Sequence, residues 1–129
     1  MRGFTLLEAL IAIAIAALAL GALARAAGQG ARTAAEVADR QQAAMVARAV
    51  VSTGTFAEDY LAAPEGESPP WAWRVRVTPQ PAVLADAAHS QPDQTLPAAR
   101  VLVEVFRLGE RDAEPVWVLS AWKPYRTAP

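Results

Sequence analysis

The sequence predicts an α+β protein in which a long N-terminal helix, membrane-spanning in its first half, packs on a small antiparallel sheet. Residues 4–24 form an apolar run with one ionisable side chain. All ten prolines and all four tryptophans lie after residue 63. Because proline breaks helix interiors, the proline-free part favours one helix and the rest favours short strands. We expect a transmembrane helix over 4–24, its continuation over 25–63 and a sheet domain over 64–129.

The first element is a membrane-inserting helix. The chain is apolar from Phe4 to Ala24 and uninterrupted from Ala9 to Leu20. Twenty-one helical residues reach about 30 Å, the thickness of a bilayer's hydrocarbon core. The remaining residues are too few to cover a helix that is apolar on every side, so a buried core helix is disfavoured.

A cleaved signal peptide is an alternative, because Ala22-Leu23-Ala24 fits the small-x-small cleavage pattern. Glu8 opposes it, since a carboxylate within a membrane segment costs on the order of 3 kcal/mol and a disposable signal gains nothing from it. A retained intramembrane charge needs a partner. Two are available: the Met1 amine near Arg2, or a new amine made by cutting the chain close to Glu8.

The N-terminal residues resemble the processing site of type IV pilins and of the pseudopilins of type II secretion. The resemblance rests on a glycine, a phenylalanine, an isolated glutamate and a long apolar run in fixed order, Gly3-Phe4-Thr5-Leu6-Leu7-Glu8-Ala9-Leu10-Ile11-Ala12. It implies that a prepilin peptidase removes residues 1–3 as a leader and methylates the amine of Phe4. Glu8 then occupies the fifth mature position. In a filament, Glu8 of one subunit can pair with the Phe4 amine of its neighbour, which relieves both charges and fixes the axial register.

The resemblance also implies a location and a function. The chain would cross the bacterial inner membrane once, with a cytoplasmic N-terminus and a periplasmic C-terminal domain. Its length and tryptophan-containing strand are similar to those of the I subunit, a minor pseudopilin that helps to form the tip of the type II secretion pseudopilus. The implied partners are other minor pseudopilins, the major pseudopilin, prepilin peptidase and the inner-membrane secretion platform.

Two other functions remain open. A minor type IV pilin belongs to the same structural class. A signal-anchored periplasmic module that binds a ligand through Trp71 and Trp73 belongs to a different one.

The helical pattern continues beyond the membrane segment to about Val50, and residues 51–55 are expected to end it. One helix face carries mostly alanine and is interrupted by Gln41; we interpret it as a packing surface against the chain's own sheet or against sister helices. Its members are Ala27, Ala31, Ala34, Ala38, Met45 and Ala49.

The second half contains three predicted strands. By composition, residues 64–70 are a linker. Residues 71–78 alternate, with Trp71, Trp73, Val75 and Val77 on one face. The arginines between these residues would also fit a strand whose tryptophans stack on single-stranded nucleic acid. A half-buried strand that covers the helix is favoured instead. Residues 99–108 form the strongest strand, with Val101, Val103 and Val105 on one face; 115–121 form another, after a charged connection over 109–114.

Composition excludes several functions. A net charge of −1 disfavours a nucleic-acid partner, and the absence of cysteine removes disulfides and thiolate chemistry. No catalytic motif is present, so we expect a structural protein without a cofactor rather than an enzyme. Asp86, His89 and Asp93 have spacings that suggest a metal site, but no further carboxylate is clustered there, and we expect no bound metal.

Overall fold

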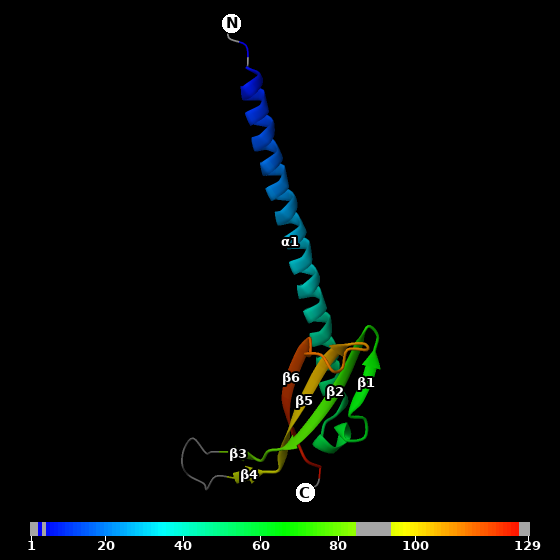
Figure 1. Ribbon diagram of the computed structural model, residues 1–129. Coiled ribbons are helices and arrows are strands. Elements are labelled where there is room, and N and C mark those ends of the chain that lie inside the picture. The colour runs from blue at the N-terminus through cyan, green and yellow to red at the C-terminus, as the bar shows by residue number, and fades with distance from the viewer. Residues whose placement is uncertain (1–2, 4, 85–93, 127–129) are drawn as a thin grey trace. The chain divides into compact units, whose positions relative to one another are not determined.

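The structure, a computed structural model, describes residues 3, 5–84 and 94–126 (Figure 1). It confirms the predicted class: one long apolar helix and a small antiparallel sheet. The chain divides into two compact units, Met1–Ala38 and Asp39–Pro129. The elements are α1 (Leu6–Thr53), the 3₁₀ helix η1 (Ala57–Tyr60), β1 (Glu65–Ser68), β2 (Trp71–Pro79), β3 (Ala82–Leu84), β4 (Gln94–Leu96), β5 (Ala98–Arg107) and β6 (Trp117–Pro124).

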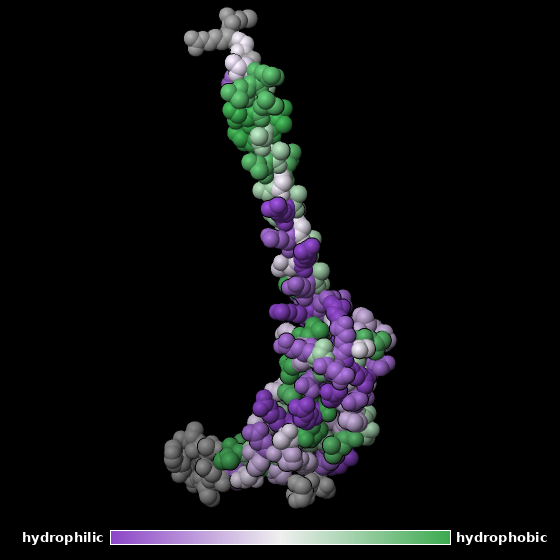
Figure 2. All heavy atoms as spheres, viewed as in Figure 1, coloured by the Kyte–Doolittle hydropathy of each residue, from purple (hydrophilic) through white to green (hydrophobic). Residues whose placement is uncertain are grey.

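The first unit is the N-terminal part of α1. Every described side chain from Thr5 to Ala38 is exposed, and Figure 2 shows the apolar residues gathered at the N-terminal end of the helix. Among the described residues, α1 is the one helix long and apolar enough to cross a membrane. No described residue of this unit covers its apolar side chains, which is compatible with a helix that lies in a membrane.

The second unit is built on a four-stranded antiparallel sheet in the order β1-β2-β5-β6. The predicted strands over 71–78 and 99–108 are confirmed as β2 and β5, whose register places Val75 opposite Val103. The third predicted strand, 115–121, is displaced toward the C-terminus and runs from Trp117 to Pro124 as β6. The short strands β3 and β4 pair with each other in a region where no strand was predicted.

The interpretation of residues 64–70 as a linker is wrong, because Glu65–Ser68 forms the edge strand β1. Proline and glycine gave this segment the composition of a loop. Its pairing is supported from elsewhere in the chain: Glu65 accepts hydrogen bonds from Arg74 Nε at 3.1 Å and from Arg111 Nη1 at 2.9 Å. Gly66 also leaves room for the Trp73 indole, which would lie 2.2 Å from a Cβ at position 66.

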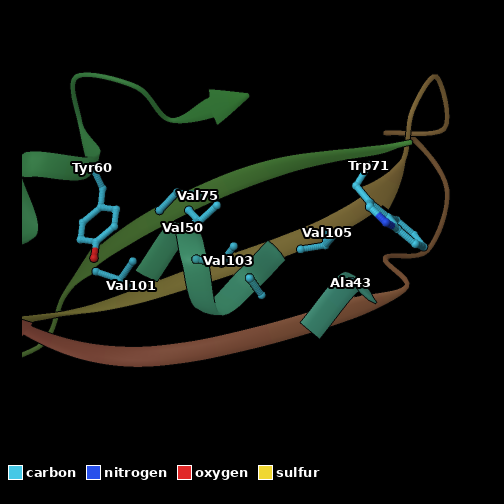
Figure 3. Close-up of a cluster of buried hydrophobic side chains, with 9 residues drawn as sticks. Ala43, Val50, Tyr60, Trp71, Val75, Val101, Val103 and Val105 are labelled. Atoms are coloured by element: carbon cyan, nitrogen blue, oxygen red, sulfur yellow. The ribbon is translucent and has the colours of Figure 1, made fainter. Parts of the chain in front are cut away.

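The core lies between β2, β5 and the C-terminal part of α1 (Figure 3). The predicted inward face of the strongest strand is confirmed, since its three valines are completely buried. The helix contributes Ala43, Ala47 and Val50. Small alanines let the helix approach the sheet closely, and the valines fill the space between them. The members of the core cluster are Ala43, Ala47, Val50, Tyr60, Trp71, Val75, Val101, Val103 and Val105.

Two residues of the alanine face predicted for the helix, Met45 and Ala49, do not pack on the sheet. Met45 is 68% exposed and Ala49 is also exposed, whereas Ala43 and Ala47 are fully buried. Packing of that face on the chain's own sheet is therefore wrong for Met45 and Ala49. Alanine occurs on several sides of this helix, so hydrophobic periodicity alone did not identify the side that the sheet covers.

Candidate processing and assembly site

The candidate site lies at the start of α1. Gly3 is exposed, and a Cβ at this position would meet no other described atom within 4 Å. Packing in the described structure therefore does not require glycine here. Phe4, the predicted new N-terminus, lies outside the described residues. Thr5 follows, and the helix begins at Leu6.

Glu8 lies in the first turn of the helix and is exposed. Its carboxylate makes no ion pair with any residue that the structure describes. An acidic group in the first turn is favoured by the helix dipole, but that gain is at most about 1 kcal/mol and smaller than the cost of a carboxylate in lipid. The glutamate still needs a positive partner when the helix lies in a membrane.

Thr5 is a residue of this site that the sequence analysis missed. Its Oγ1 accepts a hydrogen bond from the Glu8 backbone N–H at 3.3 Å, and its carbonyl oxygen accepts one from Ala9 at 3.1 Å. These contacts cap the helix immediately after the predicted cleavage point. The pattern Thr-x-x-Glu before an apolar run is the signal that would have identified it.

The large apolar side chains before and after Glu8 are exposed among the described residues of their own unit. Leu6 and Leu18 are among the most exposed large side chains of the described chain. At helical spacing the large exposed apolar residues are distributed around the helix rather than along one stripe; they are Leu6, Leu7, Leu10, Ile11, Ile13, Ile15, Leu18, Leu20 and Leu23. A helix of this kind is stable in lipid or within a bundle of similar helices, and not in water alone.

The tryptophans of β2 do not form a ligand-binding surface. Trp71 is 3% exposed and belongs to the core cluster, and the Arg107 guanidinium lies 5.5 Å from its ring centroid. Trp73 packs across Gly66 of the neighbouring strand. This confirms the half-buried strand and contradicts a ligand site on the Trp71 and Trp73 face. The sequence analysis instead missed Trp122, which is 53% exposed on β6.

Asp59, an acidic residue outside the candidate site, makes contacts that hold the fold together. Asp59 Oδ2 accepts hydrogen bonds from the Phe56 and Thr55 backbone N–H groups, both at 2.9 Å, and its Oδ1 lies 2.7 Å from Arg126 Nη2. The pKa of the Asp59 carboxyl lies below its ordinary value of 3.8. The hydrogen bond from the Phe56 N–H lowers it most, and the Thr55 N–H and the Arg126 guanidinium lower it further. These contacts fasten the C-terminal segment to η1.

The residues considered for a metal site, Asp86, His89 and Asp93, lie outside the described residues. Among residues 3, 5–84 and 94–126, no three histidine, cysteine, aspartate or glutamate side chains come together to hold a metal ion.

Comparison with known proteins identifies the N-terminal region. Residues 1–24 match the family model described as "Prokaryotic N-terminal methylation motif". This motif is a type IV pilin-like prepilin signal, and the match covers Gly3, Phe4 and Glu8 together with the apolar run. No curated protein and no solved structure matches the chain.

Proposed function

We propose that the chain is a minor pseudopilin, a structural subunit of the type II secretion pseudopilus that acts at its tip. Prepilin peptidase cuts after Gly3, and the amine of Phe4 becomes methylated. The mature chain is anchored in the bacterial inner membrane by its apolar helix, with its N-terminus on the cytoplasmic side and the sheet unit in the periplasm. It acts by assembly, not by catalysis or by binding a cofactor.

The observation that carries this proposal is the position of Glu8. It is the single ionisable residue of an apolar segment that matches the methylation motif, and it stands four residues after Phe4 in the sequence. Within the described residues its carboxylate has no ion-pair partner. The methylated amine of Phe4 on a neighbouring subunit supplies the missing positive charge. Pairing stabilises both groups in lipid and fixes the axial offset between the subunits.

The exposed helix surface supports assembly through sister helices. Met45 and Ala49 are exposed, and so is every described residue before Asp39. Small residues allow helix backbones to approach closely, which is how helices associate in membranes. The partners are other minor pseudopilins and the major pseudopilin, assembled on the inner-membrane secretion platform.

The test compares Glu8→Ala with native chain in cells that contain the sister subunits and prepilin peptidase. We expect the variant to be cut after Gly3 but to lose most of its co-purification with pilin-like partners in mild detergent. Glu36→Ala is the matched control, because it removes a carboxylate from the same helix beyond the apolar run. Equal recovery of partners with Glu8→Ala would contradict charge pairing.

The identity of the co-purified partners also separates two functions. Recovery of pseudopilins supports the secretion pseudopilus. Recovery of the major pilin of a type IV pilus instead supports a minor type IV pilin, which undergoes the same processing.

A further inference from the structure

The two edges of the sheet differ in how they are protected. The β1 edge has four residues, of which two are glutamates. Arg111 contacts both of them, at 2.9 Å to Glu65 Oε2 and 3.1 Å to Glu67 Oε1. Short length and charged side chains are the usual means by which proteins prevent an exposed edge from pairing with another strand.

The β6 edge lacks this protection. The strand has eight residues, and its first six, Trp117 to Trp122, carry no charge. Among the described strands, β6 pairs with β5 alone, so its other side presents unpaired backbone donors and acceptors. Its one charged residue, Lys123, is turned toward the chain itself: Nζ donates to the Gly54 carbonyl oxygen at 2.7 Å and lies 5.9 Å from the Tyr60 ring centroid.

Large apolar side chains flank this edge on both faces of the sheet. The register places Trp117 on the face of Val105, toward the helix, and Val118 and Trp122 on the opposite face. These three side chains are 37%, 46% and 53% exposed. A strand added beside β6 would bury part of these side chains on each face of the sheet. Its backbone would form hydrogen bonds with the backbone of β6.

The face of the sheet opposite the helix, the outer face, also carries a positive charge that a partner could pair with. Arg100 lies opposite Trp122 in the register and is exposed. It makes no ion pair with any other described residue, whereas Arg76 on the same face pairs with Glu104. An acidic side chain on an added strand, on the outer face near Trp122, would complement Arg100.

We propose that β6 is a docking edge that accepts an extended segment of a second pilin-like chain in the same assembly, by strand addition. This inference rests on the proposed function. Only another strand supplies a row of alternating backbone donors and acceptors that matches the edge. The segment is uncharged on the face that meets Trp117 and carries an acidic residue on the face that meets Trp122.

The test places a photoreactive benzoylphenylalanine singly at Val118, Ser120 or Trp122 of the full chain, in membranes that contain the sister subunits. Adducts are digested and sequenced by mass spectrometry. Strand addition predicts that the three probes attach to one segment of one pilin-like chain, at successive positions two residues apart and in order. Absence of adducts, attachment to lipid, or attachment at scattered positions would overturn the proposal.

A charge substitution provides the second arm. With the probe at Val118, Ser120→Glu should lower the adduct yield about tenfold or more, because its carboxylate would lie on the outer face next to the acidic residue that the proposal places on the added strand. Ser68→Glu makes the same change on the protected β1 edge and should leave the yield unchanged. Because both serines are exposed, circular dichroism of either variant should show a native sheet. Unchanged yield with Ser120→Glu contradicts the docking edge.

The two proposals can fail separately. A chain that begins at Phe4 but gives no ordered adducts contradicts strand addition and leaves the proposed function intact. Ordered adducts from a chain that begins at Arg25 would support strand addition to β6 and would contradict the proposed function.

Discussion

The Tyr60 hydroxyl donates a hydrogen bond to the Gly54 carbonyl oxygen at 2.8 Å and also contacts the carbonyl oxygen of Val51. Both acceptors lie at the end of α1, where helix carbonyls have no partner within the helix. Gly54 is buried against the same ring, since a Cβ there would come within 2.7 Å of it. One tyrosine from η1 thus closes the helix and, as a member of the core cluster, packs this end of the helix with the sheet.

Tyr60→Phe should therefore destabilise the sheet unit by about 1–2 kcal/mol, because it removes a buried donor from two helix carbonyls. Lys123 still donates a hydrogen bond to the Gly54 carbonyl oxygen, so the acceptor that mainly loses its donor is the Val51 carbonyl oxygen. Chemical unfolding of the full chain in detergent, followed by near-ultraviolet circular dichroism, measures the change. Tyr125→Phe is the control; a loss as large in that variant would contradict the capping role.

Gly66→Ala should destabilise the β1–β2 pair by about 1–3 kcal/mol, because the new methyl group overlaps the Trp73 indole and forces it to move. Tryptophan fluorescence of the folded chain should change together with the unfolding midpoint. Gly28→Ala adds the same methyl group to open space on the helix and should be neutral or slightly stabilising. Equal stability of the Gly66 variant and the native chain would show that β1 does not hold Trp73.

The tryptophans of β2 and β6 should differ in their effect on stability. Trp71→Ala should cost about 3–5 kcal/mol, since it empties a buried core position. Trp122→Ala removes an exposed side chain and should change the free energy of unfolding by less than about 1 kcal/mol. Denaturant titration of the two variants compares them directly. Similar costs for both would contradict the assignment of Trp71 to the core and Trp122 to a surface.

Asp59 should contribute stability that depends on pH. Its folded-state pKa lies below 3.8, so the carboxylate stabilises the folded chain above that pH, and the contribution is lost as pH falls through the folded pKa. Asp59→Asn should unfold at a lower temperature than the native chain near pH 7. The difference should diminish below about pH 4. A difference that persists unchanged in acid would contradict the role of the charge.

The strands with the clearest alternation could be predicted from the sequence. Val101, Val103 and Val105 follow a period of two and are buried as expected, and Trp71 joins them. The edge strand β1 could not, because its glutamates are held by Arg111, which is 46 residues from Glu65 along the chain. Local composition does not report such a distant partner.

The candidate site was proposed from the sequence for a different reason. Gly3, Phe4 and Glu8 are recognised by their order within an apolar run, and the same residues lie within the matched motif. The sequence did not identify the side of α1 that the sheet covers, because alanine lies on several sides of this helix. Met45 is exposed, and packing of its face on sister helices stays a prediction. What Glu8 pairs with is not encoded in one chain, since its proposed partner is the amine of another subunit.

The mass of the mature chain's N-terminal peptide tests the central claim most directly. The full chain is purified from membranes of a cell that contains prepilin peptidase, digested and sequenced by mass spectrometry. The account predicts a first residue of Phe4 bearing one methyl group on its amine. A chain that begins at Arg25, after a cut at Ala24, or one that keeps Met1-Arg2-Gly3, would contradict it.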